Sequence, residues 1–250
     1  MKRILLLLII PAIIIGLASC TNPASVVGIP TNLEWAVGTN GIDLTLSWTA
    51  VDDADGYIVI TPAGDTVEPD TNTEYIFTDA IIGTYSVLAF ASAEYGTAAI
   101  LSNAPYEQTS AMTIYPLSSA HSSGFDITTS NGTADTVSMA DSTNAANVDF
   151  YLDNSMYFAS ADIFLTFTCD NKTRFLDSGT NAIVKCDEYI PGTNYFNKEQ
   201  AVSDHYYMVS FCETDATGPF YYGIIKDVIV TADNVSFKYK FQTLKGFRKF

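Results

Sequence analysis

The chain contains few residues that could carry out acid–base or nucleophilic chemistry. Its 250 residues include only two histidines, His121 and His205. A serine hydrolase would need one of them as its general base, and no serine stands in a G-x-S-x-G turn. His205 precedes two tyrosines in an apparent strand, where a histidine also serves as an ordinary sheet residue. No G-x-x-x-x-G-K or G-x-G-x-x-G segment occurs, so nucleotide use has no support.

Carboxylates are the most numerous reactive groups. Asp149 and Asp153 suggest the two acids of a glycoside hydrolase, although such pairs arise by chance among 28 acidic residues. The acidic run at residues 52–55 precedes a glycine in the manner of a calcium loop. Its first ligand position would fall on Val51, and no glutamate stands at the required distance. A turn is therefore the better interpretation of this run.

The first 20 residues predict export from the cytoplasm. Two basic residues open the chain, and an uncharged, mostly aliphatic run over residues 4–18 ends in small residues beside Cys20. This run has 15 residues and is interrupted by a proline and a glycine. A membrane-spanning helix needs about 20 apolar residues. A signal peptide over residues 1–19 is therefore favoured over a permanent membrane span.

Leu17-Ala18-Ser19-Cys20 resembles the lipobox of bacterial lipoproteins. The resemblance implies cleavage before Cys20, a diacylglyceryl thioether on its sulfur and acylation of its new amino group. Two or more acyl chains hold a protein stably on a membrane. Residues 20–28 would then form a short polar tether, and Thr21 stands where an aspartate would retain the protein in an inner membrane. The implied location is the cell envelope, at the outer membrane if the cell has one. In the alternative interpretation, Cys20 is incidental to an ordinary cleaved signal.

The predicted mature chain is strongly acidic. From Cys20 onward it carries 10 basic and 28 acidic residues, a formal charge of −18. Such a surface repels nucleic acid. The charge is uneven, because residues 4–171 contain 19 acidic residues and no lysine or arginine. This acidic part suits cation binding or the separation of like-charged surfaces, and it equally suits a solvated exterior.

Three cysteines remain besides Cys20, namely Cys169, Cys186 and Cys212. An oxidising compartment favours a disulfide, and the odd number leaves at least one thiol unpaired or intermolecular. A Cys169–Cys186 bond would close a loop of roughly 16 residues and contribute about 3 kcal/mol in the chain-entropy estimate. We prefer this pair slightly, and the other pairings stay open. A zinc site has less support because no C-x-x-C pair occurs.

The composition predicts an all-β protein. The chain has 15 tyrosines and 15 phenylalanines, and residues typical of strands and turns are abundant. No long stretch of the mature part has apolar residues at helical spacing, so we expect few and short helices. Roughly 230 residues are enough for two domains with their own cores.

Residues 29–104 have the pattern of a small β-sandwich, with short strands between Gly, Pro, Asp and Asn clusters. The strands predicted there are 44–48, 57–60, 74–78, 85–90 and 97–102. Trp48, Asp55-Gly56-Tyr57 and Gly83-Thr84-Tyr85 resemble the corresponding segments of a fibronectin type III domain, although the proline common before the last tyrosine is absent. The resemblance implies that Trp48, Tyr57 and Tyr85 are core residues and that Tyr85 forms a hydrogen-bonded corner. It also implies a spacer or binding module.

Residues 105–110 combine a proline with polar residues and lack periodicity, so they predict a linker. Residues 111–250 continue the strand pattern as a second antiparallel β-sandwich-like domain, without a recognisable family signature. The strands predicted there are 125–127, 136–139, 148–152, 162–167, 205–211, 222–231 and 235–242, with turns at Asn131-Gly132 and Asp233-Asn234.

The last predicted strand, residues 235–242, has one apolar and one polar face. Every second residue from Val235 is apolar and is expected to be buried. Lys238, Lys240 and Gln242 are expected to face water. Lysines on such a strand also protect a sheet edge against pairing with other chains.

These features favour a lipid-anchored cell-envelope protein with a binding or structural role. Its fibronectin-like module would present the second β domain for protein or glycan recognition, and enzymatic activity is the less favoured interpretation. One alternative is an envelope hydrolase acting on polysaccharide. Another follows from a resemblance of the C-terminal hairpin to the end of secreted haem-scavenging lipoproteins, which implies His121 and His205 as haem or metal ligands. No other cofactor is expected.

Overall fold

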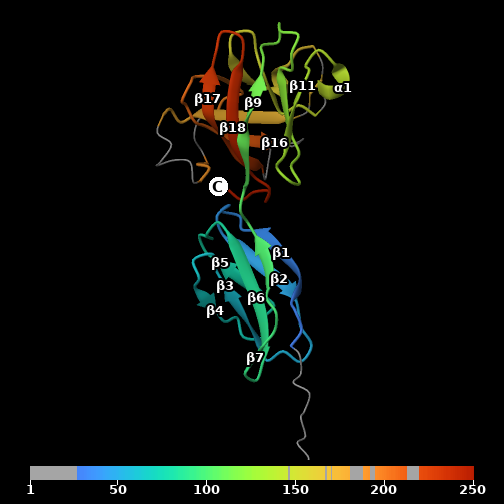
Figure 1. Ribbon diagram of the computed structural model, residues 1–250, viewed down its shortest axis with the longest axis vertical. Coiled ribbons are helices and arrows are strands. Elements are labelled where there is room, and N and C mark those ends of the chain that lie inside the picture. Colours follow the sequence, from blue (N-terminus) through green and yellow to red (C-terminus); the bar gives the residue numbers. More distant parts are fainter. Residues whose placement is uncertain are drawn as a thin grey trace, which may run out of the picture.

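The computed structural model describes residues 27–145, 147–166, 168–169, 171–180, 188–191, 195–212 and 220–250. This part of the chain forms two β-sandwich domains stacked end to end (Figure 1). It contains one four-residue helix, α1 (Ser142–Ala145), and one 3-10 turn, η1 (Ala161–Ile163). The predicted all-β fold is confirmed. Within the described ranges, no helix has the length and apolar character needed to cross a membrane.

The first domain packs a three-stranded sheet against a second sheet centred on β3 and β6. The three-stranded sheet has the order β1 (Thr31–Val37), β2 (Leu44–Thr49) and β5 (Glu74–Phe77). The second sheet contains β4 (Thr66–Val67), β3 (Gly56–Ile60), β6 (Thr84–Ala91), β7 (Glu94–Tyr95) and β8 (Ala99–Ser102). Strands β4 and β7 have two residues each, too few for the alternation of apolar and polar residues to predict them.

Alternation along the strands builds the core of the first domain. In β2, Leu44, Leu46 and Trp48 are at most 5% exposed, whereas the residues between them point outward. Trp48 packs edge-on against Tyr57, with ring centroids 5.3 Å apart. The hydroxyl of Tyr57 accepts a 2.8 Å hydrogen bond from the amide of Val51. Each fully buried side chain of this size contributes about 1.5–3 kcal/mol to folding.

Tyr85, at the start of β6, forms a tyrosine corner. Its hydroxyl donates to the carbonyl oxygen of Ile81 at 2.9 Å, and the side chain is 1% exposed. Asn103 supports the corner, because its Nδ2 donates to the same carbonyl at 2.9 Å and its Oδ1 accepts from the amide of Gly83 at 2.7 Å. Burial raises the pKa of Tyr85, so the phenol remains a donor. The corner therefore forms without the usual proline, because Asn103 holds the preceding loop.

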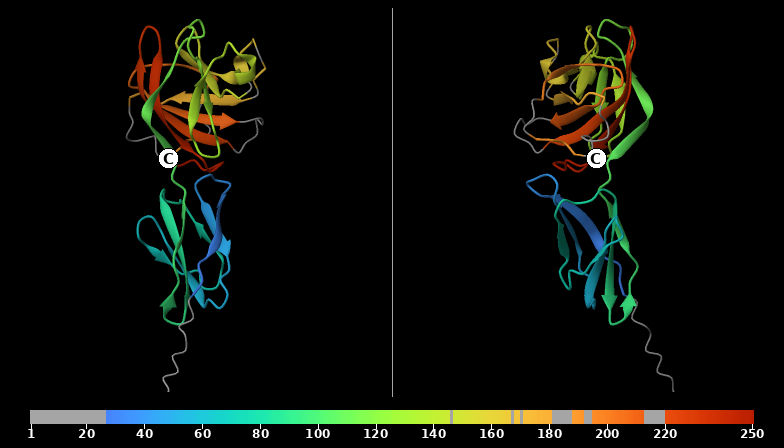
Figure 2. Two further views of the ribbon diagram at one scale, coloured as in Figure 1. Left: turned by 45° about the vertical axis from the view of Figure 1, so that its right-hand side comes forward. Right: turned by 90° about the vertical axis from the view of Figure 1, so that its left-hand side faces the viewer.

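The second domain packs two five-stranded antiparallel sheets face to face (Figure 2). The first sheet has the order β11 (Ala134–Val137), β10 (Gly124–Ile127), β12 (Phe150–Leu152), β13 (Tyr157–Ser160) and β15 (Lys198–Gln200). The second has the order β14 (Lys172–Asp177), β16 (Tyr207–Cys212), β17 (Tyr221–Val230), β18 (Val235–Gln242) and β9 (Tyr106–Ile114).

The space between these two sheets is filled by aromatic rings. Five phenylalanines from both sheets are at most 1% exposed, and their neighbouring ring centroids lie 4.6 to 6.1 Å apart. They are Phe125, Phe150, Phe158, Phe175 and Phe237. These rings bury a large apolar area, and their edge-to-face contacts add further attraction.

The predicted linker at residues 105–110 is corrected, because strand β9 begins at Tyr106. Strand β9 pairs with β18 from Tyr106 opposite Phe241 to Ile114 opposite Val235. It lies at the edge of its sheet and most of its residues are exposed or half-buried. An edge strand of this kind lacks a regular apolar alternation, which is why its sequence has the character of a linker.

The strand predicted at residues 162–167 is wrong. Residues 161–163 form the 3-10 turn η1, and Leu165 is 99% exposed. The sheet strand lies just before this segment, in β13. The ring of Phe164 packs against Tyr151, 5.2 Å between centroids, in a small cluster outside the main core. Ile163 and Phe164 are therefore packed without strand pairing, whereas Leu165 points to solvent.

Strand β18 buries the predicted apolar face, but its polar face differs from expectation. The strand lies between β17 and β9, so its lysines do not protect an edge. Lys238 pairs with Asp227 at 3.0 Å, and Lys240 lies 3.9 Å from Glu107 of β9. Gln242, predicted to face water, is fully buried. The first domain covers it, and its Nε2 donates to the carbonyl of Asn103 at 3.1 Å.

The C-terminal tail (residues 243–250) lies between the two domains (Figure 1). Phe247 is 0% exposed and belongs to the core cluster of the first domain. The amide of Arg248 donates to the carbonyl of Gly41 at 2.8 Å, and Lys249 pairs with Asp79 at 2.5 Å. Glycine is needed at position 41, because its φ is +74 and a Cβ there would lie 2.6 Å from the Arg248 side chain. The tail of the second domain thus completes the packing of the first.

We expect Phe247→Ala to lower the free energy of unfolding by about 3–5 kcal/mol, because it leaves a cavity in the first domain's core. Thermal and urea unfolding followed by circular dichroism measure this change. Phe196→Ala is the matched control, since Phe196 is 51% exposed. Equal stability of the two variants would show that the tail does not support the first domain.

Candidate functional site

The predicted lipidation and disulfide residues lie mostly outside the described part of the chain. Cys20 and Cys186 are outside it, so the anchor and the Cys169–Cys186 pair remain predictions. Cys169 is buried, at 7% exposure, in the small cluster beside Tyr151. Cys212 is the last residue of β16. The pairing of the three cysteines therefore stays open.

The two histidines lie in different surroundings. His121 stacks on Tyr115 with ring centroids 4.5 Å apart, in a shallow polar pocket with Asp233. His205 instead directs its Nδ1 at the carboxylate of Asp177, 2.9 Å away. No described interaction joins the two histidines. Among the described residues, no group of three or more His, Cys, Asp or Glu side chains could hold a metal ion.

Asp149 and Asp153 each hold the local backbone in place. The carboxylate of Asp149 is 5% exposed and accepts from the amide of Ile127 at 2.8 Å. The carboxylate of Asp153 accepts from the amides of Ser155 and Tyr157 at 2.9 and 3.0 Å and pairs with Lys198. Both carboxylates are thus occupied by structural partners. The run at residues 52–55 forms a turn, in which the amide of Ala54 donates to the carbonyl of Val51 at 3.3 Å.

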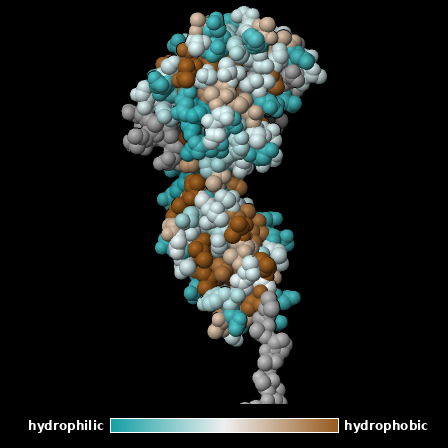
Figure 3. Space-filling view, in the orientation of Figure 1, coloured by the Kyte–Doolittle hydropathy of each residue, from teal (hydrophilic) through white to brown (hydrophobic). Residues whose placement is uncertain are grey.

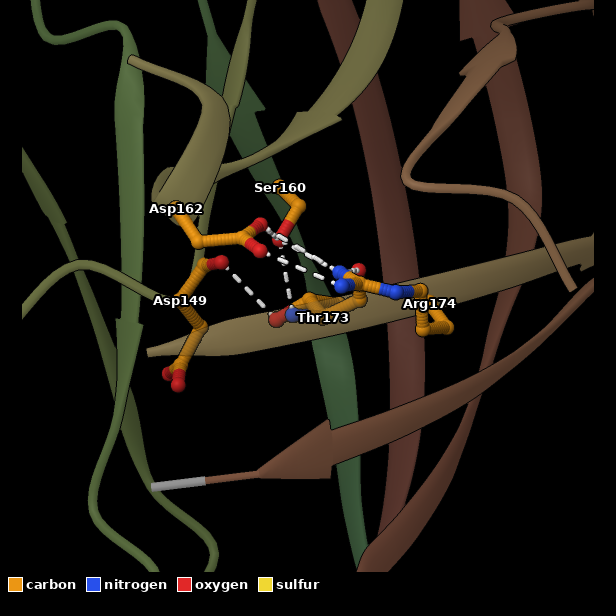
Figure 4. Close-up of polar contacts among 5 residues, drawn as sticks. All are labelled: Asp149, Ser160, Asp162, Thr173 and Arg174. Carbon is orange, nitrogen blue, oxygen red and sulfur yellow. Dashed lines mark hydrogen bonds and ion pairs between the residues drawn. The ribbon is translucent and has the colours of Figure 1, made fainter. Parts of the chain in front are cut away.

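A polar network joins the two sheets of the second domain (Figure 4). Ser160 and Thr173 are 0% exposed. The amide of Thr173 donates to the Ser160 hydroxyl oxygen at 2.8 Å, and its own hydroxyl donates to the backbone carbonyl of Asp149 at 2.8 Å. Arg174 donates from both terminal nitrogens to the carboxylate of Asp162, at 3.2 and 3.1 Å. The network connects β13 with β14.

This network is suited to holding the sheets together rather than to catalysis. The Ser160 hydroxyl donates to Asp162 and accepts from Thr173 and Arg174, so its oxygen has no free lone pair for attack. A serine nucleophile needs a neighbouring base that removes its proton, and Asp162 is instead paired with Arg174. Buried polar groups that are fully hydrogen-bonded stabilise one specific arrangement of a core.

The junction between the domains contains a concave site. It is an open cleft of about 620 Å³. The β1–β2 loop (residues 37–41) lines it from the first domain, and Phe220, Tyr222, Lys245 and Arg248 line it from the second. Ligand sites occur preferentially at domain interfaces and combine apolar walls with a few polar groups. We name this feature the junction cleft.

Phe220 and Tyr222 form an aromatic part of the junction cleft's lining, and two further tyrosines pack behind Tyr222. Tyr222 stacks on Tyr189, 4.2 Å between centroids, and Tyr189 stacks on Tyr195 at 4.6 Å. Burial raises the pKa values of all three phenols, so they remain uncharged at neutral pH. Arg248, at the base of the cleft, pairs with Glu188 at 3.1 Å. Its Nε is buried with no hydrogen-bond partner among the described residues.

None of the residues of the junction cleft was predicted from the sequence. Two signals were present: the Asn40-Gly41 turn and the three basic residues within 245–249 of an otherwise acidic chain. Neither signal shows that the two segments meet, because they lie about 200 positions apart and only the packing of the tail brings them together.

The first domain also exposes apolar side chains, some of them visible as brown surface in Figure 3. The large hydrophobic residues there that are about half exposed or more are Ile29, Ile76, Ile81, Tyr95 and Ile100. Exposed apolar residues are common on folded proteins, so these side chains alone do not define a site.

No protein-family model matches the chain, and no curated protein matches it either. The solved structure "Structure of FN3tt mut" is 16% identical over 32% of this chain and 97% of that chain, with a TM-score of 0.28. A two-domain fibronectin type III segment from chicken tenascin is 14% identical over 79% of this chain and 98% of that chain, with a TM-score of 0.26. The two-sheet packing and the Tyr85 corner of the first domain are independent of these likenesses, and they are fibronectin type III-like features.

We expect Asp162→Asn to lower the free energy of unfolding at neutral pH by about 1–2 kcal/mol, because Arg174 loses its charged partner. Burial by itself would raise the pKa of Asp162, but the hydrogen bonds from Arg174 and Ser160 outweigh burial and lower it. A carboxylate whose pKa is lowered by folding stabilises the fold at pH values above its pKa in the unfolded chain, about 3.9. This stabilisation is lost as the pH falls through its pKa in the folded protein.

The difference between Asp162→Asn and the native chain should therefore shrink as the pH is lowered from about 7 to about 2. Urea unfolding at both pH values measures it. Asp233→Asn, at an exposed turn, is the control and should change little at either pH. A destabilisation by Asp162→Asn that is the same at both pH values would contradict the role of the ionised carboxylate.

Proposed function

We propose that this chain is a lipid-anchored protein of the cell envelope that recognises a protein or a glycan. Its fibronectin type III-like domain would act as a spacer, and the second domain would be presented for binding. The observation that carries this proposal is the junction cleft, a concave site built by both domains whose lining includes the rings of Phe220 and Tyr222. Such a site suits binding, because its polar groups are few and none forms a nucleophile–base pair.

The placement of the first described residue supports an anchor at Cys20. Val27 and Gly28 lie beside Gly96, whose Cβ would be 2.6 Å from the carbonyl oxygen of Gly28. Gly96 follows β7, at the end of the first domain that is remote from the second (Figure 1). A lipid on Cys20 would therefore place the first domain next to the membrane and the second domain away from it.

The charge distribution supports the same orientation. Residues 27–103 contain 11 acidic residues and no lysine, arginine or histidine. A domain without cations is repelled by anionic headgroups, so it would stand on its tether rather than lie on the lipid surface. The polysaccharide hydrolase and the haem-binding protein have no comparable support among the described residues, because Asp149, Asp153 and His205 are each occupied by a structural partner.

We expect Cys20→Ser to release the protein from the membrane fraction, because the thioether that would hold the lipid cannot form. Membrane fractionation and intact-mass measurement of the mature N-terminus test this. Cys169→Ser is the matched control and should stay with the membrane. An unacylated N-terminus in the native protein, or membrane retention of Cys20→Ser, would contradict the anchor.

Recognition is tested separately with the mature chain in detergent, on arrays of envelope glycans and of envelope proteins. We expect at least one array to show binding that the β1–β2 loop substitution Asn40→Ala weakens, because this loop lines the junction cleft. The exposed Ile100→Ala variant, in β8, should bind as the native chain does. Failure to bind any component of either array would contradict the recognition role.

A further inference from the structure

We infer that the junction cleft binds an acidic oligosaccharide, with the Lys245 ammonium pairing with one sugar carboxylate. This inference rests on the proposed recognition role and specifies its ligand. A uronic acid combines the two chemistries that the cleft offers, since the C–H face of its ring packs on apolar walls and its single carboxylate needs a cation.

Lys245 is the cation that the fold leaves available. Seven of the nine described lysine and arginine side chains have a described carboxylate within 4.0 Å. The two without one are Lys172 and Lys245, and of these only Lys245 lines the junction cleft. The other two basic residues of the tail already have carboxylate partners, because Arg248 pairs with Glu188 and Lys249 pairs with Asp79.

The position of the Lys245 ammonium is restricted even without a carboxylate. It lies over the ring of Tyr221, 5.5 Å from the centroid, in a cation–π contact. Tyr221 packs against the core between the two sheets, whereas Phe220 and Tyr222 belong to the separate cluster that includes Tyr189. The Lys245 side chain lines the cleft, so its ammonium would exchange the Tyr221 ring for an anion that enters there.

Asn40 supplies a complementary donor on the opposite wall. Its Oδ1 accepts from the amides of Ile42 and Asp43 at 3.1 and 3.0 Å, which fixes the side chain in the β1–β2 loop. Its Nδ2 has no partner among the described residues and is a donor suited to a sugar hydroxyl. The cleft thus offers apolar walls, one amide donor and one ammonium.

The overall charge decides between classes of anion. The mature chain carries a formal charge of −18, so it repels a dense polyanion overall. At physiological salt this repulsion is screened beyond about 8 Å. A ligand with single carboxylates separated by neutral groups gains the local ion pair and avoids most of the repulsion. An acidic peptide offers carboxylates but no rigid apolar ring to pack against Phe220.

The test is titration calorimetry of the mature chain in detergent with trigalacturonic acid and with its methyl ester. We expect the acid to bind, the ester to bind about tenfold more weakly, and Lys245→Met to lose about tenfold in affinity for the acid, the cost of one charge-assisted pair. Lys172→Met is the matched control and should bind the acid as the native chain does, because Lys172 lies in β14 outside the cleft.

The outcomes separate this inference from the recognition role. Equal binding of acid and ester, or unchanged binding by Lys245→Met, would overturn the acidic-sugar assignment. Tighter binding of an octaglutamate peptide that Lys245→Met abolishes would also overturn it, while leaving recognition at the cleft in place. Binding of another array glycan by a chain that does not bind trigalacturonic acid would likewise overturn the acidic-sugar assignment and leave the recognition role in place. If neither trigalacturonic acid nor any array component binds, both the inference and the recognition role are overturned.

Discussion

The burial of Phe247 in the first domain is the contact on which the rest of this structure depends. A phenylalanine from the end of the chain completes a core that is otherwise built from residues 27–101. The hydrogen bond from Arg248 to Gly41 and the ion pair from Lys249 to Asp79 lie on either side of it. Tandem domains joined only by a linker move independently by default. Here the shared core makes the orientation of the domains a consequence of folding, and the junction cleft is formed by that orientation.

The two domains use charge differently. The first has no cation of its own, and Lys249 of the tail supplies a partner for its Asp79. In the second, Lys226, Lys238 and Lys240 extend across the outer face of the β17–β18–β9 sheet and pair with carboxylates on it. These exposed pairs contribute little individually to stability. Their effect is to neutralise three of the second domain's cations, whereas Lys245 at the cleft has no carboxylate partner among the residues that the structure describes.

Inside the second domain, an aromatic core and a buried polar network hold the two sheets together in different ways. The phenylalanine cluster around Phe150 supplies most of the apolar burial but has no strong directional preference. The bonds among Ser160, Thr173 and Asp149 are directional, and they fix the position of β14 relative to β13. Displacement of either strand would leave buried polar groups without partners, which costs about 1–3 kcal/mol each.

The sequence by itself determined the local structure of several strands with one face on a core, although β13 and β14, which also contribute to the core, were not predicted. Alternation predicted β2, β3, β6 and β18, because a period of two residues is the direct requirement of a half-buried strand. It also predicts an export signal at residues 1–19, from two basic residues followed by an uncharged aliphatic run.

Only the tertiary structure decided what packs against the strand faces and segments that do not follow this alternation. Gln242 has the polarity of a surface residue but is buried against Asn103 of the first domain and the C-terminal tail. Ile163 and Phe164 pack in the small cluster beside Tyr151 without joining a sheet. Strand β9 is polar because it is an edge strand, and β18, the strand with which it pairs, lies far away in the sequence. The junction cleft likewise joins residues 37–41 to residues 245–248. Contacts between segments so far apart depend on the packing of whole elements, which no local pattern encodes.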